Sequence, residues 1–431
     1  MRHSPFIVRP LALSVALSLV APVALALDTP IITSSSTTIT DALNVVQGAG
    51  TVTTTNDTNI TQVTGAVSGT GELVKQGEGT LSLTADNAYK GGTSIEEGTL
   101  SIKRAASLGT GDVKIANDAT LETQKSTAAN KTTTLTQNIS LSGSATISTN
   151  DAENITQITS TVSGAGSLTK AGAGTLSLTA DNSFGAGTTT IIEEGTLAIS
   201  RTGSLGASTK IDIKDGATLK TNQDVADIKQ NVNIIGQGKI DTGGKNIALD
   251  GKVIDGTNST LTGQVTGGTL VKIGSGSLTL ANTTNDQSNT VISGGILIIN
   301  DKSNLGTSNG NVTISSGTLQ TNADMSLENT IITSGSAGGS INTGGHDVEL
   351  AGQVTGAGRL VKTGGGTLTL TQANDYNIST ALDKDGNIVA TVGNTVINGG
   401  VLAISNDNQL GISAQDLGVK TAKDDQYKWE L

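Results

Sequence analysis

The chain has 431 residues, of which 56 are Gly, 4 are Pro, none is Cys and 1% are aromatic, and its formal charge is −11. The lack of cysteine excludes disulfides and cysteine-based zinc sites, and the excess of Asp and Glu (37) over Lys and Arg (26) offers no basic surface for nucleic acid. All four prolines lie at or before position 30, so nothing in the rest of the chain interrupts a ladder of β-strand hydrogen bonds.

The first 26 residues have the pattern of a secretory signal peptide. Arg2 and Arg9 give a positively charged start, and the apolar run Leu11–Ala26 ends in the small-x-small pattern Ala24-Leu25-Ala26. We therefore predict cleavage after Ala26, with Ala24 and Ala26 as the small residues of the signal cleavage site. A single membrane anchor is the alternative, but the run is short and a cleavage pattern follows it. No second apolar run of about 18 residues occurs, so no transmembrane helix is expected.

One motif recurs four times in the remaining chain. In the first copy it reads ELVKQGEGTLSL, and its lysine marks the four copies at Lys75, Lys170, Lys272 and Lys362. Recurrence at a nearly fixed period is the signature of a structure built by stacking. We therefore expect an extended surface and not a closed pocket around a substrate.

A shorter period lies within each copy. In the first copy a GTL-like strand falls at Leu81, Leu100 and Leu121. The two leucines of GTLSL are two positions apart, so both point to the same face of a strand. A period near 20 residues made of short strands and glycine turns predicts an all-β fold, a parallel β-helix (β-solenoid) of roughly 18–19 rungs.

These periods divide the chain into three parts. We expect a signal peptide at 1–26, a β-helical region at 27–411 in four long repeats (about 46–125, 145–221, 239–322 and 340–411), and a polar tail at 412–431 that loses the pattern. Copy three is longer around Lys252–Leu261, and copy four carries an insert near Asn377–Val392. Such inserts are expected to leave the rod as loops, where binding specificity commonly lies.

Few residues offer catalytic or metal-binding chemistry. After the signal peptide the sequence has one histidine, His346, which lies in a turn. The sequence therefore lacks the histidine and cysteine residues that zinc sites and histidine-based catalytic relays need. Gly306–Gly310 matches GxSxG but lies at a repeated exit turn and not between a strand and a helix. Asp383–Asn387 resembles the start of a Ca²⁺ loop without its closing Glu, which favours a tight turn. We predict no catalytic, cofactor-binding or metal-binding residues.

Paired carboxylates occur at Glu96-Glu97 and at Glu193-Glu194. Neighbours in a strand point to opposite faces, so these pairs are not expected to converge on one substrate atom. The four repeated lysines are expected about 20 Å apart along the rod, well beyond the Debye length of about 8 Å, and so form no single basic patch.

An aromatic residue occupies one shared repeat position, at Tyr89, Phe184 and Tyr376, with Gln287 near it in copy three. An aromatic side chain packed at a turn is favoured there over a platform for a ligand.

The order of these motifs resembles the passenger-associated repeats of bacterial autotransporters, the type V secreted proteins. The shared pattern is xIxT…LxGxVxGxGxLxKxGxGTLxL…NxYxGxT…GTLxI, and it covers roughly Val46 to Gly411. The resemblance implies a right-handed parallel β-helix passenger, exported by the Sec translocon and carried across a Gram-negative outer membrane by a β-barrel translocator. Family members usually end in that barrel and this sequence has none, so we expect a truncated gene, a fragment, or a passenger served by a separate barrel.

Passengers of this kind often act as adhesins, aggregation factors or scaffolds. The resemblance therefore implies a non-catalytic, adhesin-like protein that binds an unknown host or bacterial ligand. It would lie at the cell surface or outer membrane or be secreted, and would be periplasmic if truncated. The alternatives are a β-helical polysaccharide-active enzyme, an ice-binding solenoid, or a truncated fragment without function. The enzyme needs basic residues gathered in one groove, and the only arginines after the signal peptide are Arg104, Arg201 and Arg359, which lie far apart in copies one, two and four.

Overall fold

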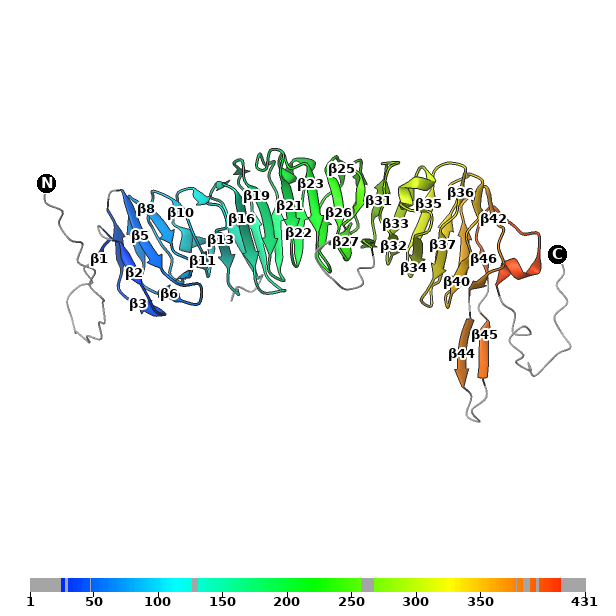
Figure 1. Ribbon diagram of the computed structural model, residues 1–431, viewed down its shortest axis with the longest axis horizontal. Helices are drawn as coiled ribbons and strands as arrows, with labels where there is room; N and C mark the ends of the chain where they lie inside the picture. The colour runs from blue at the N-terminus through cyan, green and yellow to red at the C-terminus, as the bar shows by residue number, and fades with distance from the viewer. Residues whose placement is uncertain are drawn as a thin grey trace.

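The computed structural model describes residues 25–27, 30–46, 48–125, 131–256, 267–376, 378–382, 388–392 and 395–411. Parallel strands stack into one elongated β-solenoid of about 16 turns, which confirms the predicted all-β fold (Figure 1). The number of turns is slightly below the predicted 18–19. That prediction divided the whole chain after the signal peptide by one rung length, whereas copy four devotes residues to a hairpin that adds no turn.

Most turns of the coil contribute a strand to each of three faces, and the chain visits these faces in a fixed order. The first face begins with a three-stranded sheet and continues in a twelve-stranded one: β1 (Leu25–Ala26), β4 (Leu43–Val45) and β7 (Val67–Gly69), then β14 (Thr132–Leu135), β17 (Ile155–Ile158), β20 (Thr175–Leu178), β22 (Thr196–Ile199), β24 (Thr218–Thr221), β27 (Gln237–Asp241), β30 (Thr269–Ile273), β32 (Asn289–Ile292), β34 (Asn311–Ile314), β37 (Thr330–Thr333), β40 (Val354–Gly356) and β43 (Asp375–Tyr376).

The second face begins with a seven-stranded sheet and continues in an eight-stranded one: β2 (Ile31–Thr33), β5 (Ala49–Thr54), β8 (Glu72–Gln76), β10 (Thr93–Ile95), β12 (Val113–Ile115), β15 (Ile139–Leu141) and β18 (Val162–Ser163), then β25 (Val225–Ile228), β28 (Ile247–Leu249), β31 (Ser277–Leu280), β33 (Ile296–Ile299), β35 (Thr318–Thr321), β38 (Gly339–Asn342), β41 (Leu360–Thr363) and β46 (Val396–Ile397).

The third face begins with an eleven-stranded sheet and continues in a four-stranded one: β3 (Thr37–Ile39), β6 (Ile60–Val63), β9 (Thr80–Leu83), β11 (Thr99–Ile102), β13 (Thr120–Thr123), β16 (Ser144–Thr149), β19 (Ser167–Ala171), β21 (Thr189–Ile192), β23 (Lys210–Ile213), β26 (Asn231–Ile234) and β29 (Val253–Asp255), then β36 (Met325–Leu327), β39 (Val348–Leu350), β42 (Thr367–Leu370) and β47 (Val401–Ala403).

Short 3₁₀ helices form at the repeated exit turns and explain why each face changes sheet. They are η1 (Ala105–Leu108), η2 (Thr202–Leu205), η3 (Lys302–Leu305) and η4 (Asp407–Leu410). The first three contact β14, β25 and β36 respectively, the first strands of the later sheets. Each helix therefore takes the place of a strand for one turn. Gly109, which follows η1, has a φ of +63°, a backbone conformation that favours glycine.

The long repeat does not close on a whole number of turns. The lysine-bearing strands of the four copies are β8, β19, β30 and β41, which lie on the second, third, first and second faces. From β8 the second face continues through β10, β12, β15 and β18 before the chain reaches β19, so one long repeat comprises four turns and one third. Consecutive copies are thus rotated by one face, and only copies one and four present the same residues in the same direction.

Columns of aliphatic side chains fill the coil. Leu81, Leu100, Leu121 and Ile147 are direct partners in adjacent strands, and all are fully buried. Full burial of one such side chain stabilises the fold by about 1.5–3 kcal/mol, so the repeated core is a sum of many similar layers.

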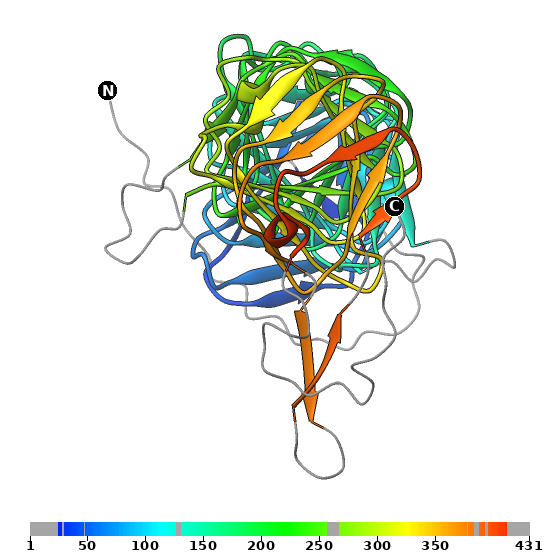
Figure 2. The same ribbon diagram turned by 90° about the vertical axis from the view of Figure 1, so that its right-hand side faces the viewer.

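One hairpin departs from the coil. Strands β44 (Ile378–Leu382) and β45 (Ile388–Val392) pair antiparallel and project away from the side of the rod (Figures 1 and 2). The copy-four insert therefore leaves the rod, as its position outside the repeat pattern predicted.

Candidate functional site

Each copy places a lysine in a core column. Lys75 lies two positions after Leu73 in β8, so both side chains point into the coil, and Lys75 is fully buried. Its Nζ donates hydrogen bonds to the carbonyl oxygens of Gln76, Gly77 and Glu97, with distances of 2.9 Å to Gln76 and Glu97. Because Glu97 belongs to the next turn of the coil, the lysine ties two successive turns together.

The same arrangement recurs in the other three copies. Three backbone carbonyls accept from each Nζ at 2.6–3.0 Å, in the sets Ala171, Gly172 and Glu194 for Lys170, Ile273, Gly274 and Gly294 for Lys272, and Thr363, Gly364 and Gly399 for Lys362. Gly295, which follows the third acceptor of copy three, has a φ of +63°, and a Cβ there would lie 2.8 Å from the Nζ of Lys272. Glycine at this turn therefore leaves room for the ammonium group.

Burial lowers the pKa of Lys75, Lys170 and Lys272 from 10.5 to about 8 and lowers the pKa of Lys362 as well. A pKa near 8 keeps the ammonium protonated at neutral pH, where its three N–H groups match three carbonyl acceptors. The lysines therefore bind backbone inside the rod and offer no charge to a ligand. Their burial was missed from the sequence, although the spacing of LxK within a strand already places the lysine on the same face as the leucine.

An asparagine in each copy ties three turns. Asn87 accepts from the backbone N–H of Val67 at 2.8 Å and donates to the carbonyl of Ser107 at 2.6 Å. Val67 lies in the preceding turn and Ser107 in the following one. Asn182, Asn285 and Asn374 make the equivalent pair of bonds at 2.6–3.0 Å. These bonds satisfy backbone groups at turns, where the strand ladder cannot.

The repeated aromatic position is buried, as predicted. Tyr89, Phe184 and Tyr376 are all fully buried. Gln287 takes this position in copy three and is also fully buried, but its Oε1 has no hydrogen-bond partner among the described residues. Ser107 Oγ in copy one and Asp375 Oδ1 in copy four are likewise buried without a hydrogen-bond partner among the described residues.

The projecting hairpin is inserted into a turn that copy one keeps short. In copy one the Tyr89 hydroxyl and Thr93 Oγ1 lie 2.6 Å apart, and only Lys90–Gly92 connect the two residues. In copy four the Tyr376 hydroxyl and Thr395 Oγ1 lie 2.7 Å apart, but residues 377–394, including β44 and β45, stand between them. The same hydrogen bond thus closes the base of both loops, and the hairpin is supported by the rigid rod.

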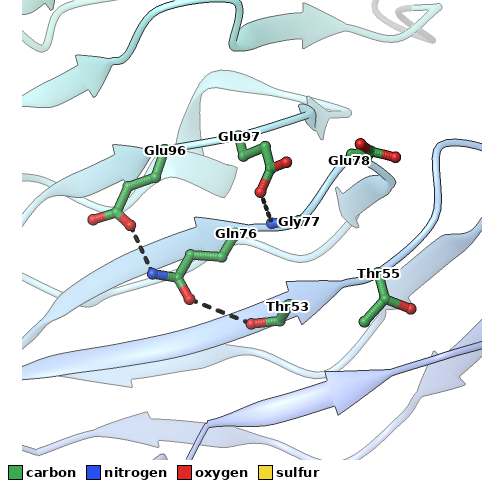
Figure 3. Close-up of a pocket in the computed structure, with 7 residues that line it drawn as sticks. All are labelled: Thr53, Thr55, Gln76, Gly77, Glu78, Glu96 and Glu97. Carbon is green, nitrogen blue, oxygen red and sulfur yellow. Dashed lines mark hydrogen bonds between the residues drawn. The ribbon is translucent and has the colours of Figure 1, made fainter.

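A shallow acidic groove lies on the rod surface in copy one (Figure 3). It has a volume of about 560 Å³ and is lined by Thr53, Thr55, Gln76, Gly77, Glu78, Glu96 and Glu97. The Glu96 carboxylate accepts from the Gln76 side chain at 2.7 Å, and the Glu97 carboxylate accepts from the backbone N–H of Gly77 at 3.1 Å. These two carboxylates are thus held in place by the turn beside them, and the groove presents acceptors to a hydroxyl-rich or cationic partner.

The expectation that Glu96 and Glu97 point to opposite faces is wrong. Strand β10 ends at Ile95, so both residues lie in the following turn and both line the groove. Strand alternation does not apply to a turn. Glu193 and Glu194 likewise follow β21, which ends at Ile192.

Other residues singled out in the sequence lie apart from the groove and from one another. His346 is in the turn after β38, with its Nδ1 3.4 Å from a carboxylate oxygen of Asp324. Gly306 caps η3 at the start of the GxSxG match. Ala26 lies in β1, beside Leu27, whose N–H donates to Asn44. Ala24, Asp383–Asn387 and the tail 412–431 lie outside the described residues.

Within the described ranges, no group of three or more His, Cys, Asp or Glu side chains is placed to hold a metal ion. In that same part of the chain, no helix is long and apolar enough to span a membrane.

Comparison with known proteins identifies the repeat. The family profile of the passenger-associated-transport-repeat matches residues 73–102, 168–199, 270–299 and 360–377, so each match contains one of the four buried lysines. The adhesin BmaC autotransporter of Brucella suis biovar 1 (strain 1330) is 29% identical over 148 residues, which are 33% of this chain and 4% of that protein. No solved structure matches the chain. The predicted resemblance to autotransporter passengers is thereby confirmed.

Proposed function

We propose that this chain, which carries four passenger-associated transport repeats, is a non-catalytic autotransporter passenger that acts as an adhesin-like rod at the cell surface. The observation that carries the proposal is that the four matched repeats form one continuous coil from which a hairpin projects (Figure 1). The repeats supply a long, self-supporting stalk. The similarity to an autotransporter adhesin supports the surface role.

The hairpin β44–β45 is the element we propose to contact the ligand. A two-stranded hairpin is at best marginally stable on its own, and this one is held at its base by the bond between Tyr376 and Thr395. It is also the feature that distinguishes copy four from copy one, which lies on the same faces of the coil. The proposed ligand lies on a host or bacterial surface.

Loop exchange tests this role. Replacing residues 377–394 by Lys-Gly-Gly, the connection that copy one uses, should leave the melting temperature of the rod within about 2 °C, because the local anchor is retained. Binding of the labelled rod to bacterial and host cells should fall to background. Inserting residues 377–394 between Tyr89 and Thr93 of the exchanged variant should restore binding. Unchanged binding by the first variant would rule out the hairpin as the contact element.

Export and partners are tested separately. The proposed route uses the Sec translocon, removes residues 1–26, and needs an outer-membrane β-barrel translocator as a partner. Cleavage after Ala26 would remove β1, whose Leu25 pairs with Leu43 of β4. N-terminal sequencing of the exported protein should therefore begin at Leu27, and protease treatment of intact cells should degrade it if it reaches the surface. Turnover of a polyuronate or another polysaccharide by the purified rod would contradict the non-catalytic role.

A further inference from the structure

Each copy contains a pair of turn residues that contact its buried lysine from the next turn of the coil. The first residue donates its backbone N–H to the carbonyl oxygen of the lysine at 2.8–2.9 Å, and the carbonyl of the second accepts from the lysine Nζ at 2.9–3.0 Å. We name this pair the lysine turn. Its members are Glu96-Glu97, Glu193-Glu194, Ser293-Gly294 and Asn398-Gly399. Because both bonds go to one lysine, they fix the length of backbone that lies between them.

The second residue of the lysine turn has a free backbone N–H. The two bonds to the lysine use the N–H of the residue before it and its own carbonyl, so the geometry leaves this group over in every copy. Among the described residues, no acceptor bonds the N–H of Glu97, Glu194, Gly294 or Gly399. An N–H without an acceptor gives up its proton to hydroxide more readily than a bonded one, and the nitrogen then acts as a nucleophile.

Copy four alone places an amide side chain beside this free N–H. The first residue of the turn is a glutamate in copies one and two and a serine in copy three, and neither side chain has an amide that can lose ammonia. Asn398 carries such an amide, is exposed to water, and belongs to a residue type prone to chemical change on heating. Gly399 has no Cβ to hinder the approach of its nitrogen.

We propose that Asn398-Gly399 is a site of spontaneous deamidation and backbone isomerisation. The Gly399 nitrogen forms a bond to Cγ of Asn398, and its proton passes through water to the side-chain nitrogen, which leaves as ammonia. The resulting succinimide takes up one water molecule. Opening at Cγ gives aspartate, and opening at the main-chain carbonyl gives isoaspartate, in which the backbone runs through the side chain and is longer by one methylene group.

Isoaspartate no longer fits the lysine turn. The added methylene lies between the N–H that bonds the Lys362 carbonyl and the carbonyl that accepts from the Lys362 Nζ, so the two bonds cannot both be kept. Losing an acceptor is costly for a buried ammonium group. The preceding strand β46 is paired with Lys362 through Ile397 and follows Thr395, which bonds Tyr376 at the base of the hairpin. The modification therefore loosens copy four beside the projecting hairpin.

The other Asn-Gly pair of the sequence provides an internal control. Asn309 is also exposed, but Gly310 is buried and its N–H donates to the carbonyl of Thr307 at 2.9 Å. The Gly310 carbonyl in turn accepts from Asn329 Nδ2 at 2.9 Å. This glycine nitrogen is bonded and held in place, so it is not available for attack on the neighbouring amide.

Peptide mapping of the full chain measures the reaction. During incubation at mildly alkaline pH, aspartate and isoaspartate should accumulate several-fold faster at position 398 than at position 309. The two rates should converge in urea, where neither pair is folded. The rate at position 398 should rise with pH, because the attacking nitrogen must lose its proton. Equal rates at the two positions in the folded rod, or no conversion at position 398, would overturn the proposal.

Labelling of Lys362 with an amine-reactive reagent tests the consequence. Labelling should be several-fold faster in aged wild-type protein than in fresh protein, with Lys272 as the reference within each sample. Aged Asn398→Ser, which has the serine of copy three at this position, should label as slowly as fresh wild-type protein. Fresh Asn398→Asp adds the charge without lengthening the backbone and should label slowly too. Conversion at position 398 without faster labelling of Lys362 would overturn the loosening of copy four.

Discussion

Copies one and three solve the same local problem with different side chains. Both keep the buried lysine, at Lys75 and Lys272, and both keep the asparagine that ties three turns. They differ at the repeated aromatic position in the core. Copy one has Tyr89 there, hydrogen-bonded to Thr93, and copy three has Gln287, whose Oε1 has no partner among the described residues. The groups that satisfy backbone carbonyls and amides are retained, while the side chain that fills space is exchanged. The repeat is thus defined first by its hydrogen bonds and only second by its packing.

Among the changes that test this comparison, removing the lysine should lower the free energy of unfolding the most. Lys75→Met keeps the apolar stem but leaves the carbonyls of Gln76, Gly77 and Glu97 without their donor, and we expect the free energy of unfolding to fall by about 3 kcal/mol. Urea denaturation measures the loss. Lys272→Met should lose as much if the role is shared between copies, and Lys114→Met, on the surface, should change little. A loss below about 0.5 kcal/mol for Lys75→Met would refute the importance of the carbonyl contacts.

A pH titration tests the same groups without mutation. Burial lowers the pKa of three of the lysines from 10.5 to about 8, so between these values the unfolded chain holds more protons than the folded one. The free energy of unfolding should therefore rise from pH 8 to pH 10, by up to about 2 kcal/mol per lysine. Burial also raises the pKa of Tyr89 and Tyr376, which removes stability only above pH 10. Denaturation at several pH values measures the slope. It should be smaller in Lys75→Met, and a flat profile would contradict the lowered pKa values.

Truncating the asparagine should cost somewhat less. Asn87→Ala removes the acceptor for Val67 and the donor for Ser107, and we expect the free energy of unfolding to fall by about 2 kcal/mol. Hydrogen exchange at the amide of Val67 should become faster, which locates the loss in copy one. Asn285→Ala should behave alike in copy three. A much smaller loss there would show that copy three is already loosened around Gln287.

Restoring the aromatic residue should produce the smallest change, and it should be stabilising. Gln287→Tyr removes an unsatisfied buried oxygen and brings a hydroxyl towards Thr290, so we expect a gain of about 1 kcal/mol in the free energy of unfolding. The reciprocal Tyr89→Gln should destabilise copy one. Destabilisation by Gln287→Tyr would contradict this expectation. It would show that the core of copy three has no room for a tyrosine, because Asn304 fills the volume that Tyr89 occupies in copy one.

The sequence by itself determined the solenoid, the four copies and the burial of Tyr89, Phe184 and Tyr376. Periodicity is a local property, and a period near 20 residues with glycine turns leaves few ways to bury leucines other than stacking. It also marked an insert near residues 377–392, because these residues lie outside the repeat pattern.

Only the tertiary structure decided what the recurring polar residues do. Lys75 bonds Glu97 in the next turn, and Asn87 bonds groups in the turns before and after it, so their partners depend on which turns lie side by side. The same holds for Glu96 and Glu97, which share a groove because the chain has already left the strand. The rotation of each copy by one face is likewise visible only in the structure. The number of residues in a long repeat does not show that the repeat makes four turns and one third. Hydrogen bonds between turns are non-local contacts, and a pattern read along one chain does not contain them.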